Sequence, residues 1–238
     1  MFRYYLSGYL RTAYVDNQLW KQPLIPSNTP MLTFALVVIG SYLLGSIPFG
    51  YLAGRIAGVD IRKCGSGNVG ATNVIRTLGK AYGYPVFVAD FLKGFGAVKM
   101  SMLIATRLQP ESNSSEMFGI VAAISSVLGH SFPVWLHFKG GKGVATSAGA
   151  LFGLAPVAAL VGAAVWILTF SFTRYVSVAS ITAAAVLPVI ILITTWLRQT
   201  PGKSLFYSSV CLAAVVIWRH RSNLSRLVRG TETRFTRK

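Results

Sequence analysis

One segment of this chain concentrates glycine, short polar side chains and basic residues: DIRKCGSGNVGATNVIRTLGK, residues 60–80. Glycines let backbone amides approach a ligand closely, and arginine and lysine add positive charge, a combination that suits a phosphate or a carboxylate. An ordinary polar loop with turn glycines would not require this density of such residues. The candidate anion-binding residues are Ser66, Gly67, Asn68, Thr72, Asn73 and Arg76.

Residues 65–70 of this segment also fit the pattern Gly-x-Gly-x-x-Gly. We reject a dinucleotide-binding interpretation, because no strand is expected before these residues and a lone match of this kind is weak. Asp90, which lies 20 residues further on, sits in an apolar stretch together with Lys93. For these two residues a structural ion pair is at least as well supported as a catalytic role.

A second glycine-rich segment, HSFPVWLHFKGGKGVATSAG, covers residues 130–149. It is not a Walker A loop, since Leu136 replaces the first glycine of that motif and Gly143 replaces its Ser/Thr. Glycine amides and a lysine before an apolar helix nevertheless predict an anion site at the helix N-terminus. The alternative is a tight turn with a snorkelling lysine. The candidate residues are Gly140, Gly141, Lys142 and Gly143.

Two further segments carry weaker signals. In TRYVSVASI, Arg174, Ser177 and Ser180 share one helical face, although serines in membrane helices often only pack. In WRHRSNLSRLVRGTE, residues 218–232, His220 and Asn223 are three residues apart on one face. A basic amphipathic tail that binds anionic lipid would account for the arginines of this segment but not for the His-x-x-Asn pair.

The chain offers little for hydrolytic chemistry. It contains no Gly-x-Ser-x-Gly, no His-Glu-x-x-His, no cysteine cluster and no paired carboxylates. We therefore expect neither a metal site nor a cofactor. Phosphate-binding loops, cations, hydroxyls and one His/Asn pair suit transfer between two phosphorylated substrates, with catalysis mostly by positioning and electrostatics.

The composition defines the solvent in which these segments must fold. Of the 238 residues 53% are hydrophobic and 12% are charged, and the net charge is +17. A chain so poor in charge cannot be disordered or cover the surface of an ordinary soluble globule, and its two cysteines exclude a disulfide scaffold. It is predicted to be an all-α, polytopic membrane protein. Its basic residues then mark cytoplasmic loops and an anionic substrate rather than nucleic acid.

Apolar stretches of membrane-crossing length occur at residues 31–57, 83–107, 117–138, 144–172, 176–198 and 203–219. The fourth stretch is either one long span or a hairpin hinged near Pro156. With the N-terminus outside, the hairpin places 15 basic residues inside against 6 outside, whereas a single crossing would put the basic tail outside. We therefore predict about seven transmembrane segments, an outside N-terminus and a cytoplasmic C-terminus. All four motif segments then fall on the cytoplasmic face.

The predicted domain organisation is simple. Residues 1–30 form an N-terminal extension, residues 31–233 a single membrane acyltransferase domain, and residues 234–238 a basic tail. The activity in that description comes from a resemblance. The runs GSGNVGATNVIRTLGK, FKGGKGVAT and HRSNLSRLVRGTE, in this order, resemble the three motifs of the PlsY family. The resemblance extends over residues 35–233.

Members of the PlsY family are bacterial acyl-phosphate:glycerol-3-phosphate acyltransferases, and the resemblance implies the same activity here. A fatty acyl group would move from acyl phosphate to the 1-hydroxyl of glycerol 3-phosphate, giving lysophosphatidic acid and phosphate as the first step of phospholipid biosynthesis. It also implies a monomeric, multi-pass protein of the bacterial inner membrane, in contact with lipid and without nucleic acid. The implied catalytic residues are Ser66, Lys142, Ser177, His220 and Asn223.

Two assignments stay open at the level of sequence. Ser180 is close enough to Ser177 to be its alternative. Proton removal from the attacking hydroxyl falls either to His220 or to the phosphate of the acyl donor. Two other classes of protein compete with the enzyme. An anion transporter would place its site at the midplane and usually show internal repeats, and a lipid-bound scaffold would not need the Gly-Ser-Asn segment.

Overall fold

The computed structural model describes residues 30–108, 115–197 and 203–235, so the predicted extension, apart from its last residue, and the final three residues lie outside the described part. Within these ranges the chain is helical and has no strand, which confirms the all-α fold. The helices are α2 (Pro30–Ser46), α3 (Phe49–Ile56), α4 (Ala71–Leu78), α5 (Lys80–Leu108), α6 (Ser115–Ser131), α7 (Val144–Leu154), α8 (Pro156–Thr173), α9 (Val176–Trp196), α10 (Lys203–Arg219) and α11 (Arg221–Val228). Two 3-10 turns, Ile61–Lys63 and Val134–Leu136, interrupt the loops.

The outer surface of this bundle is apolar. Among the described residues, four helical segments are long and apolar enough to cross a membrane: Met31–Ile56, Ser115–Leu136, Pro156–Thr173 and Val176–Trp196. Large side chains such as Phe172 (87% exposed) and Trp196 (82% exposed) project from them. Helices that expose apolar surface and satisfy their own backbone polar groups are suited to lipid. The protein is thus a multi-pass membrane protein, and the count of seven crossings stays a prediction.

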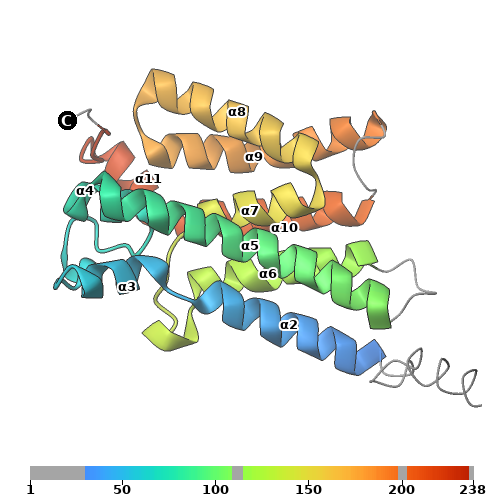
Figure 1. Cartoon of the computed structure of the whole chain (residues 1–238). Helices are drawn as coiled ribbons and strands as arrows, with labels where there is room; N and C mark the ends of the chain where they lie inside the picture. Colours follow the sequence, from blue (N-terminus) through green and yellow to red (C-terminus); the bar gives the residue numbers. More distant parts are fainter. Residues whose placement is uncertain (1–29, 109–114, 198–202, 236–238) are drawn as a thin grey trace, which may run out of the picture.

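Two prolines shape the apolar stretches. The predicted hairpin is present, because α7 ends at Leu154, α8 begins at Pro156, and the two helices run in opposite directions (Figure 1). The first predicted stretch, residues 31–57, matches the candidate span Met31–Ile56, but its helix breaks between α2 and α3 at Ile47 and Pro48, a break that was not predicted from the sequence. Proline lacks a backbone N–H and disfavours helical geometry in the residue before it.

The helices cross closely where glycines remove side chains. On α5, a Cβ at Gly94 would collide with the carbonyl of Thr146 on α7, and Gly149 of α7 lies equally close to the backbone of Phe91. Gly129 of α6 lies in the same way against Tyr42 of α2. Without a hydrophobic drive between helices in lipid, such close packing is a main source of helix association.

All four motif segments lie at one end of the bundle. Figure 1 shows α3, α4 and α11, the start of α7 and the turn between α8 and α9 at the end that holds the C-terminus, opposite the start of α2. Hydrogen bonds join these segments, as described below. The predicted convergence of the motifs is therefore present, while the side of the membrane on which they lie stays a prediction.

Candidate active site

The first motif forms a loop that is held by its own side chains. Asn73 is only 2% exposed, and its amide group spans the loop. Its Nδ2 donates to the carbonyls of Cys64 (3.0 Å) and Asn68 (2.9 Å), and its Oδ1 accepts from the amide of Ser66 (2.8 Å). This geometry assigns Asn73 to loop shape, because both hydrogens of its Nδ2 are engaged and none is left to donate to a phosphate.

The backbone amides of this loop differ from expectation. The amide of Gly67 donates to the carbonyl of Cys64 (3.0 Å), and the amide of Gly70 donates to Oδ1 of Asn68 (2.8 Å). With Ser66 also engaged, these amides close the loop and do not form an open phosphate cradle. Gly65 and Gly67 have positive φ angles of 55° and 70°, which explains the glycines as turn residues.

Side chains remain as the anion ligands of the first motif. The hydroxyls of Ser66 and Thr72 have no hydrogen-bond partner among the described residues, and both lie near the N-terminus of α4. Arg76 lies one turn further along α4, and its Nη2 donates to the carbonyl of Thr233 (3.0 Å). Burial lowers the pKa of its guanidinium below the ordinary value, but an arginine stays charged.

Hydrogen bonds hold the glycine-rich loop of the second motif on both sides. The amides of Gly140 and Gly141 donate to the carbonyls of Ser131 (3.2 Å) and His130 (3.0 Å). Arg219 donates from Nη2 to the carbonyl of Gly140 (2.8 Å) and from Nε to that of Gly141 (3.0 Å). The expectation that the Gly140 and Gly141 amides face an anion is therefore not met. Their role is to fix the path of the chain into Lys142.

Lys142 carries a half-buried charge in this loop, and no hydrogen bond or ion pair engages its ammonium within the described ranges. Its pKa is lowered to about 8, first by burial, which the charge of Glu232 opposes and those of Arg226, Arg76 and Arg219 reinforce. The charges of these groups therefore act on the ammonium. Gly143, at φ 81°, turns the chain into α7, so that Lys142 lies just before a helix N-terminus.

Glu232 connects the remaining motif residues, and sequence reasoning assigned it no role. Its Oε1 accepts from Ser177 Oγ (3.0 Å) and Asn223 Nδ2 (2.6 Å), and its Oε2 accepts from Arg226 Nε (2.7 Å). Burial raises the pKa of the carboxyl, but these three donors outweigh it and hold the pKa below the usual range. One signal could have found Glu232: it is the one acidic residue in a strongly basic C-terminal segment.

The two serine candidates separate in the structure. Ser177 is buried at the start of α9 and faces Glu232. Ser180 instead donates to the carbonyl of Val176 (2.8 Å) and accepts from Trp166 Nε1 (3.1 Å), which places it in the contact between α8 and α9. Of the two, Ser177 therefore belongs to the candidate site.

His220 and Asn223 are buried together where α10 meets α11. His220 Nδ1 lies 2.8 Å from the carbonyl of Val216, so the ring takes the tautomer with the proton on Nδ1 and an accepting Nε2. Burial lowers the pKa of His220 to about 4, against the backbone hydrogen bond and with help from the charge of Lys142. The ring is neutral at pH 7. The buried Oδ1 of Asn223 has no partner within the described residues.

The segment after α11 lies across the site as a strap, which we define as residues 231–235. Besides the Arg76–Thr233 bond, the amide of Phe235 donates to the carbonyl of Arg174 (2.8 Å), and Arg234 Nε donates to the hydroxyl of Tyr175 (3.1 Å). The strap thus ties α4 to the turn between α8 and α9. The predicted tail at residues 234–238 begins inside it.

This arrangement defines a class: a helical, multi-pass membrane protein whose motif loops bring cationic side chains together at one end. The comparisons make the class specific. The family model for glycerol-3-phosphate acyltransferase matches residues 35–230. Curated relatives named glycerol-3-phosphate acyltransferase include those of Desulforamulus reducens (44% identity, 87% of this chain and 98% of the relative) and Aquifex aeolicus (45%, 84% and 97%).

Two solved structures are also similar. Both are of PlsY, an integral membrane glycerol 3-phosphate acyltransferase, in glycerol 3-phosphate and lysophosphatidic acid forms, with TM-scores of 0.73 and 0.71. Each is 43% identical and covers 85% of this chain, with 96% and 95% of the respective solved chains. The chain belongs to the glycerol-3-phosphate acyltransferase family. It is a phospholipid-synthesising acyltransferase of the bacterial inner membrane, as the motif resemblance implied.

Proposed function

We propose that the acyl donor of this enzyme is acyl phosphate and that the acceptor is the 1-hydroxyl of glycerol 3-phosphate. The resemblance of the three motifs to the PlsY family carries the choice of donor, and the charge around Lys142 suits two phosphate-bearing substrates: Arg76, Arg219 and Arg226 act on its ammonium, and Glu232 is the opposing carboxylate. Two phosphates must approach each other for the reaction. An excess of fixed cations lowers the cost of that approach.

The residues divide into three roles in this proposal. Arg76 and Lys142 neutralise phosphate charge, and the unpartnered hydroxyls of Ser66 and Thr72 donate to phosphate oxygens. Ser177, His220 and Asn223 lie at the reacting centre. The remaining motif residues, among them Gly67, Asn68, Asn73, Gly140, Gly141 and Gly143, shape the two loops.

The phosphate of the donor takes the proton in this proposal. A general base works best with a pKa near the operating pH, whereas the pKa of His220 is about 4. A phosphate group is a base near neutral pH, since the second pKa of a phosphate monoester is about 6, and cleavage of the acyl phosphate releases a phosphate that can hold the proton. As the hydroxyl oxygen attacks the acyl carbon, the carbon–oxygen bond to phosphate breaks and the proton ends on the leaving phosphate. His220 then serves as a neutral hydrogen-bond acceptor through Nε2.

The test is an assay of the detergent-purified protein with glycerol 3-phosphate and either acyl phosphate or acyl-CoA. We expect lysophosphatidic acid with acyl phosphate alone, and a loss of at least about 100-fold in kcat/KM in Lys142→Ala. Lys139→Ala is the matched control, because Lys139 is an exposed lysine of the same loop. Product from acyl-CoA alone would overturn the proposed donor, and equal loss in both variants would remove Lys142 from the site.

A further inference from the structure

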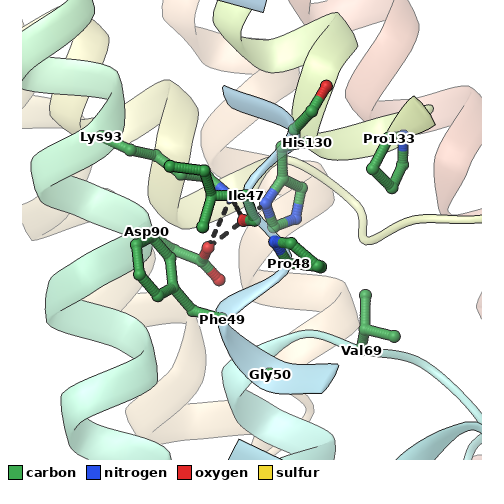
Figure 2. Close-up of a pocket in the computed structure, with 10 residues that line it drawn as sticks. Ile47, Pro48, Phe49, Gly50, Val69, Asp90, Lys93, His130 and Pro133 are labelled. Carbon is green, nitrogen blue, oxygen red and sulfur yellow. Dashed lines mark hydrogen bonds and ion pairs between the residues drawn. The ribbon is translucent and has the colours of Figure 1, made fainter. Parts of the chain in front are cut away.

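Three buried polar side chains lie beneath the active-site end and take no part in the proposed chemistry. Asp90 and Lys93 of α5 form an ion pair of 2.8 Å, and these residues are only 2% and 4% exposed. On α6, His130 Nδ1 lies 3.5 Å from Oδ1 of Asp90, and all three side chains line one small pocket (Figure 2). A buried ion pair contributes little net stability compared with apolar packing, so what these residues hold in place matters more.

At one end of this trio, Lys93 holds the break between α2 and α3. Its Nζ donates to the carbonyl of Ile47 at 2.8 Å. The chain then passes through Pro48 into α3, where Gly50 lies so close to the carbonyl of Val69 that a Cβ would collide with it. Val69 directly precedes α4 and its cap residue Gly70. Lys93 thereby fixes the segment on which the first loop rests.

At the other end, His130 packs against the glycine-rich loop. Its carbonyl accepts from the amide of Gly141 at 3.0 Å, and its imidazole occupies the space that a side chain at Gly141 would need. Arg219 holds the opposite edge of the same loop. The position of the imidazole therefore sets the path of the chain at Gly141, the residue before Lys142.

We propose that His130, held by Asp90 and Lys93, is a positioning residue of the active site that acts through Gly141 on Lys142. Through Lys93 and Ile47, the same trio fixes the first loop relative to the second. No member of the trio touches substrate. The inference rests on the proposed assignment of Lys142 to substrate phosphate.

A double-mutant cycle between His130 and Gly141 tests the inference. We expect Gly141→Ala to raise the KM for glycerol 3-phosphate about tenfold or more, with a smaller change in kcat, because the new Cβ displaces the loop from the imidazole. His130→Ala should also raise KM, since the loop loses its packing contact with the imidazole. In the double variant the collision is absent. The fold increase in its KM should therefore be smaller than the product of the two fold increases of the single variants.

Gly140 provides the matched control. A Cβ there would meet the carbonyls of His130 and Ser131 and the ring of Pro133, none of which His130→Ala removes. The effects of Gly140→Ala and His130→Ala should therefore multiply independently. His130→Asn, which also clears the space at Gly141, replaces His130→Ala in the cycle where thermal unfolding shows that the alanine variant is not folded.

The outcomes separate the inference from the function on which it rests. If the His130 and Gly141 effects also multiply independently, the positioning role is wrong and the proposed site stands. If Gly141→Ala and Lys142→Ala both leave KM unchanged in a folded, active enzyme, the loop does not bind substrate, and the site assignment itself is wrong. A deficit confined to the melting temperature, with normal KM in His130→Ala, would reduce the trio to a structural role and overturn the inference.

Discussion

At the scale of single residues, the site places one carboxylate among many cations. Glu232 accepts from Ser177, Asn223 and Arg226, which originate on α9 and α11, and its charge reaches Lys142. Hydrogen bonds that involve a charged group are about twice as strong as neutral ones. The carboxylate therefore orders the reacting side chains more than it offsets the positive charge that the substrates need.

Replacing Glu232 by glutamine should destabilise the protein. The amide keeps one oxygen and replaces the other by an NH2 group, which faces either Arg226 or the pair Ser177 and Asn223 donor to donor, and Arg226 loses its ion pair in both cases. We expect a loss of about 2–4 kcal/mol in unfolding free energy, because a buried acceptor network is left half satisfied. Thermal unfolding in detergent measures the loss. Asp60→Asn is the control: its pair with Arg62 is largely exposed, and an equal effect there would contradict the argument.

The pKa of Lys142 predicts that activity with glycerol 3-phosphate declines at alkaline pH. Its folded pKa of about 8 lies below the usual lysine value of 10.5, so its charge is present below pH 8 and lost as the pH rises through that value. We expect kcat/KM for glycerol 3-phosphate to fall above about pH 8. Between pH 8 and 10.5 the unfolded chain binds more protons than the folded one at this site, so the contribution of Lys142 to stability rises over the same range.

Replacing Lys142 by arginine tests whether Lys142 or another group causes the decline in kcat/KM above pH 8. The guanidinium stays charged throughout this range, so Lys142→Arg should remove the limb near pH 8 whatever activity it retains. The measurement is the pH profile of kcat/KM at saturating donor. A limb that persists unchanged in Lys142→Arg would assign the titration to another group.

At the scale of elements, the sequence predicts that a segment is helical better than it predicts where the helix breaks. The hairpin at Pro156 follows from counting charges, and the helix-breaking residues near it agree with that count. The break at Pro48 was not predicted, because hydropathy reads residues 31–57 as one apolar run. A single sequence also does not reveal which distant residues a buried group contacts. The spacing of Asp90 and Lys93 suggested an ion pair, but it did not predict the contacts of this pair with His130 and Ile47.

Glycines in α5 test how tightly the helices must pack. Gly94→Ala should destabilise the protein by about 1–3 kcal/mol, because its Cβ would collide with the backbone of Thr146, which cannot rotate away. Gly96, two residues further along the same helix, has nothing within 4 Å, so Gly96→Ala should be neutral or slightly stabilising. Melting temperatures in one detergent compare the two variants. Equal losses would contradict the role of the α5–α7 contact, because helix propensity alone favours alanine over glycine at both positions.

At the scale of the whole molecule, the site is recessed. Helices α7 and α8 share the corner at Ala155, but α7 has 11 residues and α8 has 18. At 1.5 Å per residue, and for similar tilts, the start of α7 lies about 10 Å deeper than the end of α8. The glycine-rich loop therefore lies below the level of the α8–α9 turn. There a soluble phosphate can meet an acyl chain, and fixed cations offset the loss of water.

The predicted orientation is open to a direct test by cysteine labelling. In a Cys64→Ala, Cys211→Ala background, Lys203→Cys and Arg229→Cys place single thiols at opposite ends of the bundle, each at an exposed position. The charge asymmetry puts the Arg229 end in the cytoplasm. An impermeant maleimide should therefore label Lys203→Cys in intact spheroplasts, and Arg229→Cys only after permeabilisation. The reverse pattern would contradict the orientation, and equal labelling of both before permeabilisation would contradict a crossing of the membrane by α10.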